Sequence, residues 1–235
     1  MNIFYCPDAV LSEYCELDET ESRHMVTVLR KREGKEIKVF DGKGNLFEAR
    51  IETIGKKVAT LNIITLLQVE DKAQPKLHIA IAPPKNIEGL EWFAEKATEI
   101  GVHEITPVIC KHSERKELRA DRIDKVLLGA SKQSLKLTIP RFNPPVSFND
   151  FVTQKRKSEQ QFIAYCEEKP MHLKEAYRGK FDAVILIGPE GDFTKEEVLL
   201  ASGNNFQIVS LGKSRLRLET AGIYATTVFN LANES

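Results

Sequence analysis

The sequence predicts an α/β protein with an open, mainly parallel sheet and a smaller β-rich domain in front of it. Apolar runs without polar alternation, such as residues 184–187, are typical of parallel strands that are buried on both faces. From Leu77 onward these runs alternate with helical patterns, which indicates helices on both faces of the sheet. Before residue 70, short strand patterns follow one another with only tight turns between them.

The composition is that of an ordinary globular protein. The 235 residues suffice for one large or two modest domains, and Lys plus Arg and Asp plus Glu both number 34. A net charge of zero argues against non-specific wrapping of nucleic acid, although it leaves room for a local basic patch. The four cysteines lack metal-ligand spacing, so we predict no metal site and reduced, mostly buried thiols.

The chain shows no targeting or membrane pattern. Its first twenty residues are acidic and lack the apolar core of a signal peptide. No apolar run approaches the roughly 20 residues that a membrane span needs. We therefore expect a cytoplasmic protein without a membrane segment.

Residues 1–72 are predicted to form the β-rich domain. Strand patterns at residues 37–40, 46–51 and 58–64 are separated by turn signals, which suggests a closed or half-closed barrel. A helix is expected before them, over residues 23–29, and it ends in the cluster Arg30-Lys31-Arg32. By sequence alone such a cluster is a solvated helix end. The polar segment 70–75 reads as a linker, because the pattern changes there.

Residues 73–235 are predicted to form the α/β domain. The expected elements, in chain order, are a strand at 77–82, a helix at 87–100, a strand at 104–109, a helix at 122–137, a loop at 139–151, a strand at 161–166 and a short helix at 171–177. The helix at 87–100 would bury Leu90, Ala97, Ile100 and either Trp92 or Phe93, and Gly101 would end it.

Residues 184–225 contain two strand-loop-helix units. The first strand breaks at Gly188-Pro189-Glu190-Gly191, and both glycines are expected to adopt backbone angles closed to other residues. Thr194 and Glu197 form a T-x-x-E capping box, so a helix should begin beside this loop with unpaired N–H groups. Alternatively, Glu190 is a first-turn acid that the helix dipole favours.

The second strand breaks at Gly212, and two arginines, Glu219 and Thr220 follow within nine residues. By spacing alone this loop is as compatible with a solvated connection as with a site. Two such loops, which we expect on neighbouring strands, favour a ligand site, because ligands of open α/β sheets bind beyond the carboxyl ends of the strands. A hydrolase or nucleotide-binding enzyme lacks support, since G-x-G-x-x-G, P-loop and G-x-S-x-G motifs are absent.

The segments GPEGDFTKEE and LGKSRLRLETA closely resemble the signature loops of the SPOUT methyltransferases, specifically the bacterial small-subunit ribosomal RNA (uracil-N3)-methyltransferases. Residues 24–30 (HMVTVLR), 34–44, 95–107 and 130–140 are also similar to that family, in the same order. The resemblance implies a PUA-like RNA-binding domain over residues 1–72 and a SPOUT domain with a C-terminal trefoil knot over 73–235. It also implies a homodimer packed through the knots, with 16S rRNA of the small ribosomal subunit as substrate.

The resemblance further implies S-adenosylmethionine as cofactor, bound largely by main-chain groups of the two loops. The expected cofactor-binding residues are Ile187, Gly188, Pro189, Glu190, Gly191, Leu211, Gly212, Leu216, Leu218 and Thr220. The expected RNA-binding residues are His24, Arg30, Lys31, Arg32, Lys85 and Arg115.

Methylation of uracil N3 removes the imide proton, and the negative charge then spreads to the flanking carbonyl oxygens. A guanidinium stays protonated and presents several donors in one plane, so it suits this charge. We assign Arg217 this catalytic role, with Arg215 as the second choice or a phosphate contact. Glu219 or Glu190 could serve as the general base, and neither is preferred.

The chain departs from the family pattern in three respects. The loop after Leu211 usually reads R-I-L-R, whereas this chain has Ser214-Arg215-Leu216-Arg217 with a shift in what precedes it. Asp192 stands where a second glycine is usual and adds a negative charge beside the cofactor loop. Lys132 and Lys136 stand where Glu and Arg are usual, which is compatible with RNA binding. A non-catalytic RNA-binding or ribosome-assembly protein that keeps the fold is the alternative function, and failure to bind S-adenosylmethionine would favour it.

Overall fold

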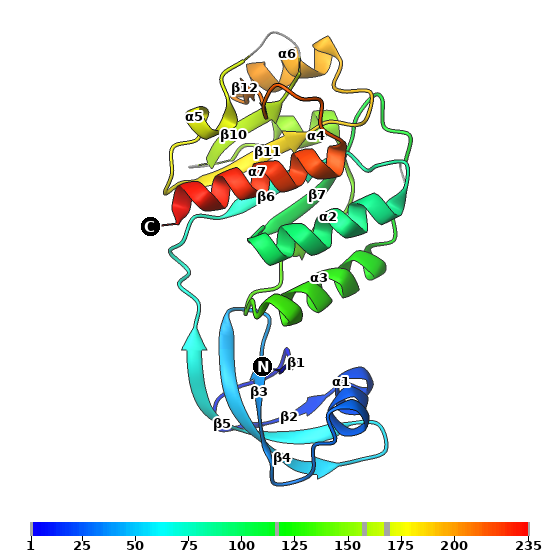
Figure 1. Cartoon of the computed structure of the whole chain (residues 1–235), viewed down its shortest axis with the longest axis vertical. Helices are drawn as coiled ribbons and strands as arrows, with labels where there is room; N and C mark the ends of the chain where they lie inside the picture. The colour runs from blue at the N-terminus through cyan, green and yellow to red at the C-terminus, as the bar shows by residue number, and fades with distance from the viewer. Residues whose placement is uncertain (1, 116–117, 157–158, 167–169, 235) are drawn as a thin grey trace. The chain divides into compact units, whose positions relative to one another are not determined.

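The computed structural model describes residues 2–115, 118–156, 159–166 and 170–234. The chain forms two compact units (Figure 1). Unit 1 comprises Met1–Ala73 together with Ser131–Ile139, and unit 2 comprises Gln74–Ala130 together with Pro140–Ser235. The assignment of Ser131–Ile139 to unit 1 was not predicted, because contacts between distant segments leave no local pattern in the sequence.

Unit 1 contains a five-stranded sheet in the order β1-β3-β4-β5-β2. Its strands are β1 Ile3–Tyr5, β2 Tyr14–Leu17, β3 Glu36–Phe40, β4 Asn45–Ile54 and β5 Ala59–Val69. The three predicted strands are confirmed, and β4 and β5 are longer than expected. The edges of the sheet approach each other, since Cys6 Sγ after β1 lies 2.8 Å from Cys15 Sγ in β2. This curvature agrees with the predicted half-closed barrel.

The predicted helix of unit 1 consists of two parts. Helix α1 spans Glu19–Arg23, begins at the N-cap Asp18 and continues as a π-helical turn, η1, over His24–Val28. Glu21 of α1 is buried, and its carboxylate forms an ion pair with the ammonium group of Lys132. Lys132 is therefore engaged inside unit 1, which corrects the expectation that it adds positive charge for RNA.

Unit 2 contains a sheet in the order β12-β10-β11-β6-β7-β8, with β9 also paired to β7. The strands are β6 Leu77–Ile81, β7 Glu104–Ile109, β8 Arg141–Phe142, β9 Val146–Ser147, β10 Glu159–Ala164, β11 Asp182–Ile187 and β12 Gln207–Val209. Every pairing is parallel, as predicted. The expectation that β11 and β12 are neighbours was wrong, because β10 lies between them and pairs with both.

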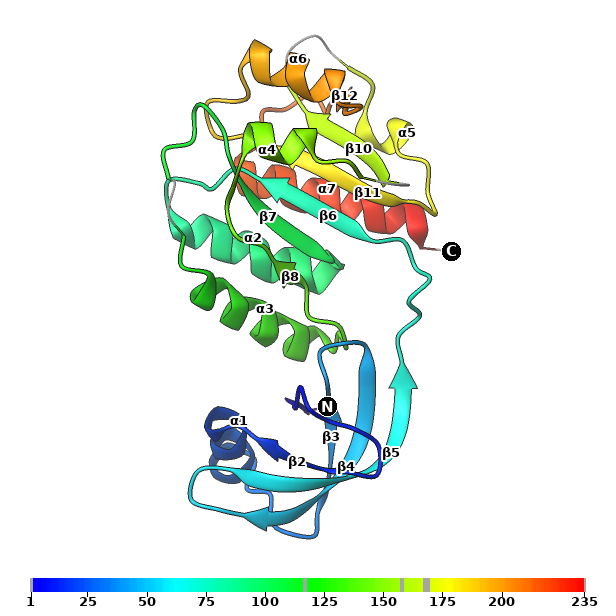
Figure 2. The same cartoon turned by 180° about the vertical axis from the view of Figure 1, so that it is seen from behind.

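Helices cover both faces of this sheet (Figures 1 and 2). Helices α2 and α7 pack together on one face, and α4 lies on the other. The helices are α2 Ile87–Ile100, α3 Ala120–Ser134, α4 Phe148–Thr153, α5 Leu173–Ala176, α6 Lys195–Gly203 and α7 Leu218–Asn233. None of the helices in the described part of the chain is both long and apolar enough to cross a membrane.

Two local predictions need correction, and one alternative that the sequence left open is decided. Helix α3 ends at Ser134 rather than Leu137, because Leu135 adopts a left-handed φ of 59°. The predicted loop 139–151 contains β8, β9 and the start of α4, elements too short to leave a periodic pattern. In α2, Phe93 and not Trp92 belongs to the buried face, since Trp92 is 45% exposed. Gly101 ends α2 with a φ of 128°, as predicted.

Two helix glycines test how tightly α7 packs. A Cβ on Gly222 of α7 would lie 2.5 Å from the buried Phe93 ring, whereas one on Gly129 of α3 would meet nothing within 4 Å. Gly222→Ala should lower the free energy of unfolding by about 1–2 kcal/mol, because overpacking outweighs the gain in helix propensity. Gly129→Ala should raise it by about 0.5–1 kcal/mol. Urea unfolding of the full chain measures both, and stabilisation by both changes would contradict the packing of α7.

Burial lowers the pKa of His78 in β6 to about 4, and Arg156 and Arg141 act in the same direction. The ring stays neutral and bonds Thr106 Oγ1 at 2.7 Å through Nε2. In the unfolded chain His78 binds a proton near pH 6.5, whereas in the folded chain it stays neutral down to about pH 4. The contribution of neutral His78 to the free energy of unfolding is therefore fully present above pH 6.5 and is lost as the pH falls towards 4. The loss should reach about 3 kcal/mol.

The test is urea unfolding of wild type and His78→Gln between pH 7 and pH 4.5. The glutamine retains a polar partner for Thr106 and cannot titrate. The wild type should lose stability relative to the variant over this range. Parallel pH profiles would contradict the buried, neutral state of His78.

Candidate functional site

The loop after β11, residues 188–194 and hereafter the β11 loop, is bonded by groups from three other loops of unit 2. Arg215 from the loop after β12 donates through Nη2 to the carbonyl oxygen of Glu190 at 3.2 Å. The amide of Lys85, after β6, donates to Glu190 Oε1 at 3.2 Å. His112, after β7, places Nδ1 3.2 Å from the carbonyl oxygen of Gly191 and 3.0 Å from that of Asp192. The two glycine-containing loops therefore meet, although their strands are not neighbours.

The glycines of the β11 loop provide space rather than unusual backbone angles. Neither Gly188 nor Gly191 has a positive φ, which corrects the expectation. A Cβ on Gly188 would lie 3.0 Å from the Phe193 ring, and a Cβ on Gly191 would lie 3.3 Å from His112 Cβ. The left-handed residue of this loop is Asp192, with a φ of 61°.

The β11 loop presents main-chain donors. The carbonyl oxygens of Glu190, Gly191 and Asp192 accept bonds from the side chains of Arg215 and His112. Within the described residues, no hydrogen bond is recorded from the amides of Gly188, Glu190 and Gly191. These amides are therefore donors without a partner in the described part of the chain.

Helix α6 begins as predicted, with the reciprocal capping box between Thr194 and Glu197. Its first-turn acids are Glu196 and Glu197. Glu190 precedes the N-cap by four residues and bonds the Lys85 amide instead. The alternative role of Glu190 as a first-turn acid was therefore wrong.

The loop after β12 separates the two arginines by their contacts. Arg215 is bonded to Glu190, whereas the exposed Arg217 is the N-cap residue of α7 and makes no side-chain cap. In the described part of the chain, the Arg217 guanidinium has no hydrogen-bond or ion-pair partner. Gly212 has a φ of 122°, Leu211 and Leu216 are half-buried, Leu218 is buried and Thr220 is exposed. Of the two arginines of this loop, Arg217 is thus the one whose guanidinium forms no hydrogen bond or ion pair with the described residues.

Asp192 lies beside the end of β10. Burial raises the pKa of the Cys166 thiol, and the charge of Asp192 and a hydrogen bond to it act in the same direction, whereas Arg215 acts against them. Asp192, Cys166 and Arg215 therefore bring together the loops after β11, β10 and β12. Cys166 is exposed, whereas Cys6, Cys15 and Cys110 are buried, and all four are free thiols.

Two predicted RNA-binding cations border the β11 loop. Arg115 donates to the carbonyl oxygen of Lys85 from Nε at 3.2 Å and from Nη2 at 2.9 Å. Lys85 Nζ lies 3.0 Å from Glu114 Oε2, and this hydrogen bond raises the pKa of Lys85. Both side chains thus help to hold the loops together, which the sequence did not indicate.

The other four predicted RNA-binding residues belong to unit 1. His24 is half-buried, with its ring centroid 6.0 Å from that of Phe4. Arg30 and Arg32 are exposed, Lys31 is half-buried, and Arg30 has a left-handed φ of 52°. The cluster that follows the π-helical turn is therefore largely open to solvent.

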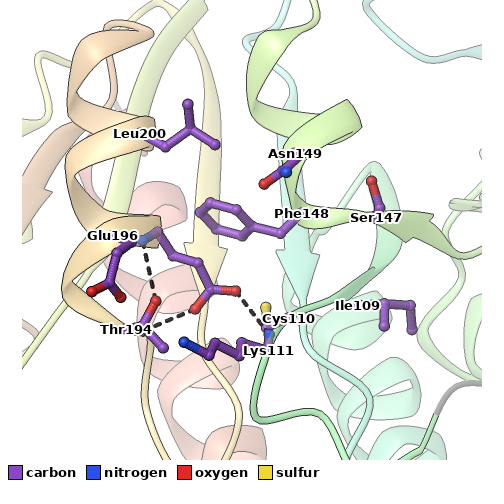
Figure 3. A pocket seen from close by; sticks show the side chains of 10 residues that line it. Ile109, Cys110, Lys111, Ser147, Phe148, Asn149, Thr194, Glu196 and Leu200 are labelled. Carbon is purple, nitrogen blue, oxygen red and sulfur yellow. Dashed lines mark hydrogen bonds between the residues drawn. The ribbon is translucent and has the colours of Figure 1, made fainter.

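A cavity of about 590 Å³ lies between α4 and α6 (Figure 3). It is lined by Ile109, Cys110, Lys111, Ser147, Phe148, Asn149, Thr194, Glu196, Glu197 and Leu200. The Glu197 carboxylate is already bonded by the amides of Lys111 and Thr194, at 2.8 Å each. No predicted site residue lines this cavity, so it is distinct from the space between the two loops. The described residues contain no group of three or more potential metal ligands.

Sequence reasoning missed His112 and Cys166. Neither belongs to a motif, and His112 is 79 residues from Gly191 in the chain. Only the convergence of the loops at one edge of the sheet reveals their contacts with the β11 loop. A histidine just after a predicted strand was the sole available signal, and it is a weak one.

Comparisons with known proteins agree with this architecture. A family model described as RNA methyltransferase domain matches residues 71–230, and one described as RNA methyltransferase PUA domain matches residues 17–64. A crystal structure of a probable rRNA-methyltransferase from Porphyromonas gingivalis is 34% identical, with a TM-score of 0.92 over 99% of this chain and 98% of that chain.

Two further relatives carry a more specific name. Ribosomal RNA small subunit methyltransferase E from Neisseria gonorrhoeae, solved bound to S-adenosyl methionine, is 27% identical, with a TM-score of 0.86 over 99% of this chain and 98% of that chain. The protein of the same name from Rickettsia conorii is 29% identical, over 92% of this chain and 89% of its own length. The chain belongs to the RNA methyltransferase family, with both its methyltransferase and its PUA domain.

Proposed function

We propose that this protein is an S-adenosylmethionine-dependent methyltransferase that methylates N3 of a uridine in 16S rRNA of the small ribosomal subunit. The observation that carries the proposal is the contact between the β11 loop and the loop after β12, made by Arg215 and Glu190. Relatives over nearly the whole chain are named ribosomal RNA small subunit methyltransferase E, and one is solved with S-adenosyl methionine. The choice of uracil N3 rests on the resemblance of the two loops.

The residues of the two loops fit this cofactor. The amides of Gly188, Glu190 and Gly191 are donors, and the half-buried Leu211 and Leu216 offer apolar surface for an adenine. Gly188 has no side chain that could shield the main chain from a ligand, and an added Cβ would lie only 3.0 Å from the Phe193 ring. Ile187, Pro189, Gly212, Leu218 and Thr220 complete the proposed set.

When bound, the cofactor supplies an electrophilic methyl group on a sulfonium. The protein must then hold the acceptor nitrogen in line with that methyl group and stabilise the negative charge that uracil acquires when N3 loses its proton. Arg217 suits the second task, because its guanidinium is exposed and has no partner among the described residues. Arg215 is engaged by Glu190 and contributes to the shape of the site instead.

The proton acceptor is left unassigned between two carboxylates. Glu190 Oε1 accepts a bond from the Lys85 amide, so this carboxylate already has a partner in the loop after β6. Glu219 lies in the first turn of α7, near Gly89 of α2.

RNA would be positioned by the cluster His24, Arg30, Lys31 and Arg32 of unit 1 and by Lys85 and Arg115 of unit 2. The trefoil knot, a homodimer packed through it, and a cytoplasmic location belong to the same proposal. Light scattering at working concentration tests the dimer, and a monomeric mass would contradict it.

The function is tested with labelled S-adenosylmethionine and small ribosomal subunits that lack the modification, followed by mapping of the labelled base. We expect label on N3 of one uridine. Label on another base or on a ribose would contradict the substrate assignment. Binding of RNA without binding of S-adenosylmethionine would support the non-catalytic alternative.

Arg217→Ala should lower kcat about 100- to 1,000-fold, as expected when a group that stabilises an oxyanion is removed. The dissociation constant for S-adenosylmethionine should change little, because the proposed role concerns the base. Arg217→Lys should recover only part of kcat, since an ammonium lacks the planar array of donors. Lys213→Ala removes an exposed cation of the same loop and is the matched control. An equal loss of kcat in this control would contradict the specific role of Arg217 and would indicate that any positive charge in the loop has the same effect.

A further inference from the structure

His112 contacts the β11 loop from outside any recognised motif. Its Nδ1 lies 3.2 Å from the carbonyl oxygen of Gly191 and 3.0 Å from that of Asp192. Carbonyl oxygens only accept hydrogen bonds, so Nδ1 carries a proton and donates to both. The imidazole also packs against Gly191, where an added Cβ would lie 3.3 Å from His112 Cβ.

These bonds lie at the residue of the β11 loop whose backbone conformation is unfavourable. Asp192 has a φ of 61°, a region that residues other than glycine occupy at a cost in free energy. Two local bonds partly offset this cost: the Asp192 amide donates to the Pro189 carbonyl oxygen at 2.8 Å, and Asp192 Oδ1 accepts from the Phe193 amide at 2.8 Å. Both bonds lie within the loop itself, so they do not fix the loop against the sheet. A strained conformation persists where the surrounding structure determines it.

His112 supplies a contact of this kind from outside the loop. His112 lies just after β7, and the β11 loop lies just after β11. In the sheet, β6 separates β7 from β11. Arg215 and the Lys85 amide bond only Glu190, the residue before Gly191. Cys166, after β10, hydrogen-bonds the Asp192 side chain, whereas His112 bonds the main-chain oxygens of both Gly191 and Asp192.

We infer that His112 is a positioning residue for the methyl donor: by donating Nδ1–H to the carbonyl oxygens of Gly191 and Asp192, it preorganises the β11 loop amides that bind the cofactor. The inference rests on the proposed function. It assigns His112 no contact with the reacting atoms. Preorganisation improves affinity by removing the cost of ordering a loop on binding.

Three variants of His112 separate this role from general packing. His112→Ala removes the donor, and His112→Asn places an amide nitrogen at the position of Nδ1. His112→Gln places its amide nitrogen near Nε2, one bond too far from the backbone. Lys111→Ala, an exposed neighbour on the same segment, is the matched control.

The dissociation constant for S-adenosylmethionine is measured by calorimetry on the full chain, and KM and kcat are measured with RNA substrate. His112→Ala should raise the dissociation constant and the KM for S-adenosylmethionine about three- to tenfold, the effect of one net hydrogen bond. It should leave kcat at saturating cofactor within about twofold of wild type, because bound cofactor restores the loop. His112→Asn should recover most of the affinity. His112→Gln should behave like His112→Ala, and Lys111→Ala should behave like wild type.

Thermal unfolding shows whether each variant is folded. If His112→Ala does not fold, the comparison of His112→Asn with His112→Gln still decides the question. Unchanged affinity in His112→Ala, or equal recovery by Asn and Gln, would overturn the role of Nδ1. A fall in kcat without a change in affinity would also overturn it. If the wild type does not bind S-adenosylmethionine at all, the proposed function itself fails, a result that is distinct from the others.

Discussion

All pairings in the sheet of unit 2 are parallel, and this register places the loops that follow β12, β10, β11, β6 and β7 at one edge. Burial of apolar side chains on both faces stabilises such a sheet, since β11 alone buries Ala183 through Ile187. The polar groups that meet around the β11 loop consequently belong to loops rather than to the strands. The contacts of the site follow from this separation, because each one joins loops that are far apart in the chain.

The β11 loop is stabilised mainly by groups outside itself. Its consecutive carbonyl oxygens at Glu190, Gly191 and Asp192 are bonded by side chains from two other loops. This arrangement divides the charged groups into two kinds. Arg215 and Arg115 are bonded to main-chain oxygens, whereas the Arg217 guanidinium has no partner among the described residues. Charge alone does not distinguish these roles, since all three residues are arginines.

Unit 1 shows the same dependence on distant segments. The segment 131–139 is attached to it by backbone bonds from Gly44 to Leu137 and from Ile139 to Gly42, and by a bond from the Leu137 amide to Glu70 Oε1. The buried Glu21 would be costly without a partner, and Lys132 from this segment supplies one. A cation that looks available in the sequence is therefore part of the interior of the unit.

The sequence by itself determined the features that depend on near neighbours. The period of apolar residues predicted β7 and α2, and the Thr194–Glu197 pair predicted the start of α6, because caps and amphipathic faces involve residues only a few positions apart. The two signature loops indicated the family, since each is a continuous stretch of the sequence. Only the tertiary structure decided that β10 separates β11 from β12, that Asp192 takes the left-handed conformation, and that His112 bonds the β11 loop. These features arise from contacts between residues that the chain separates widely, and such contacts impose no local pattern on the sequence.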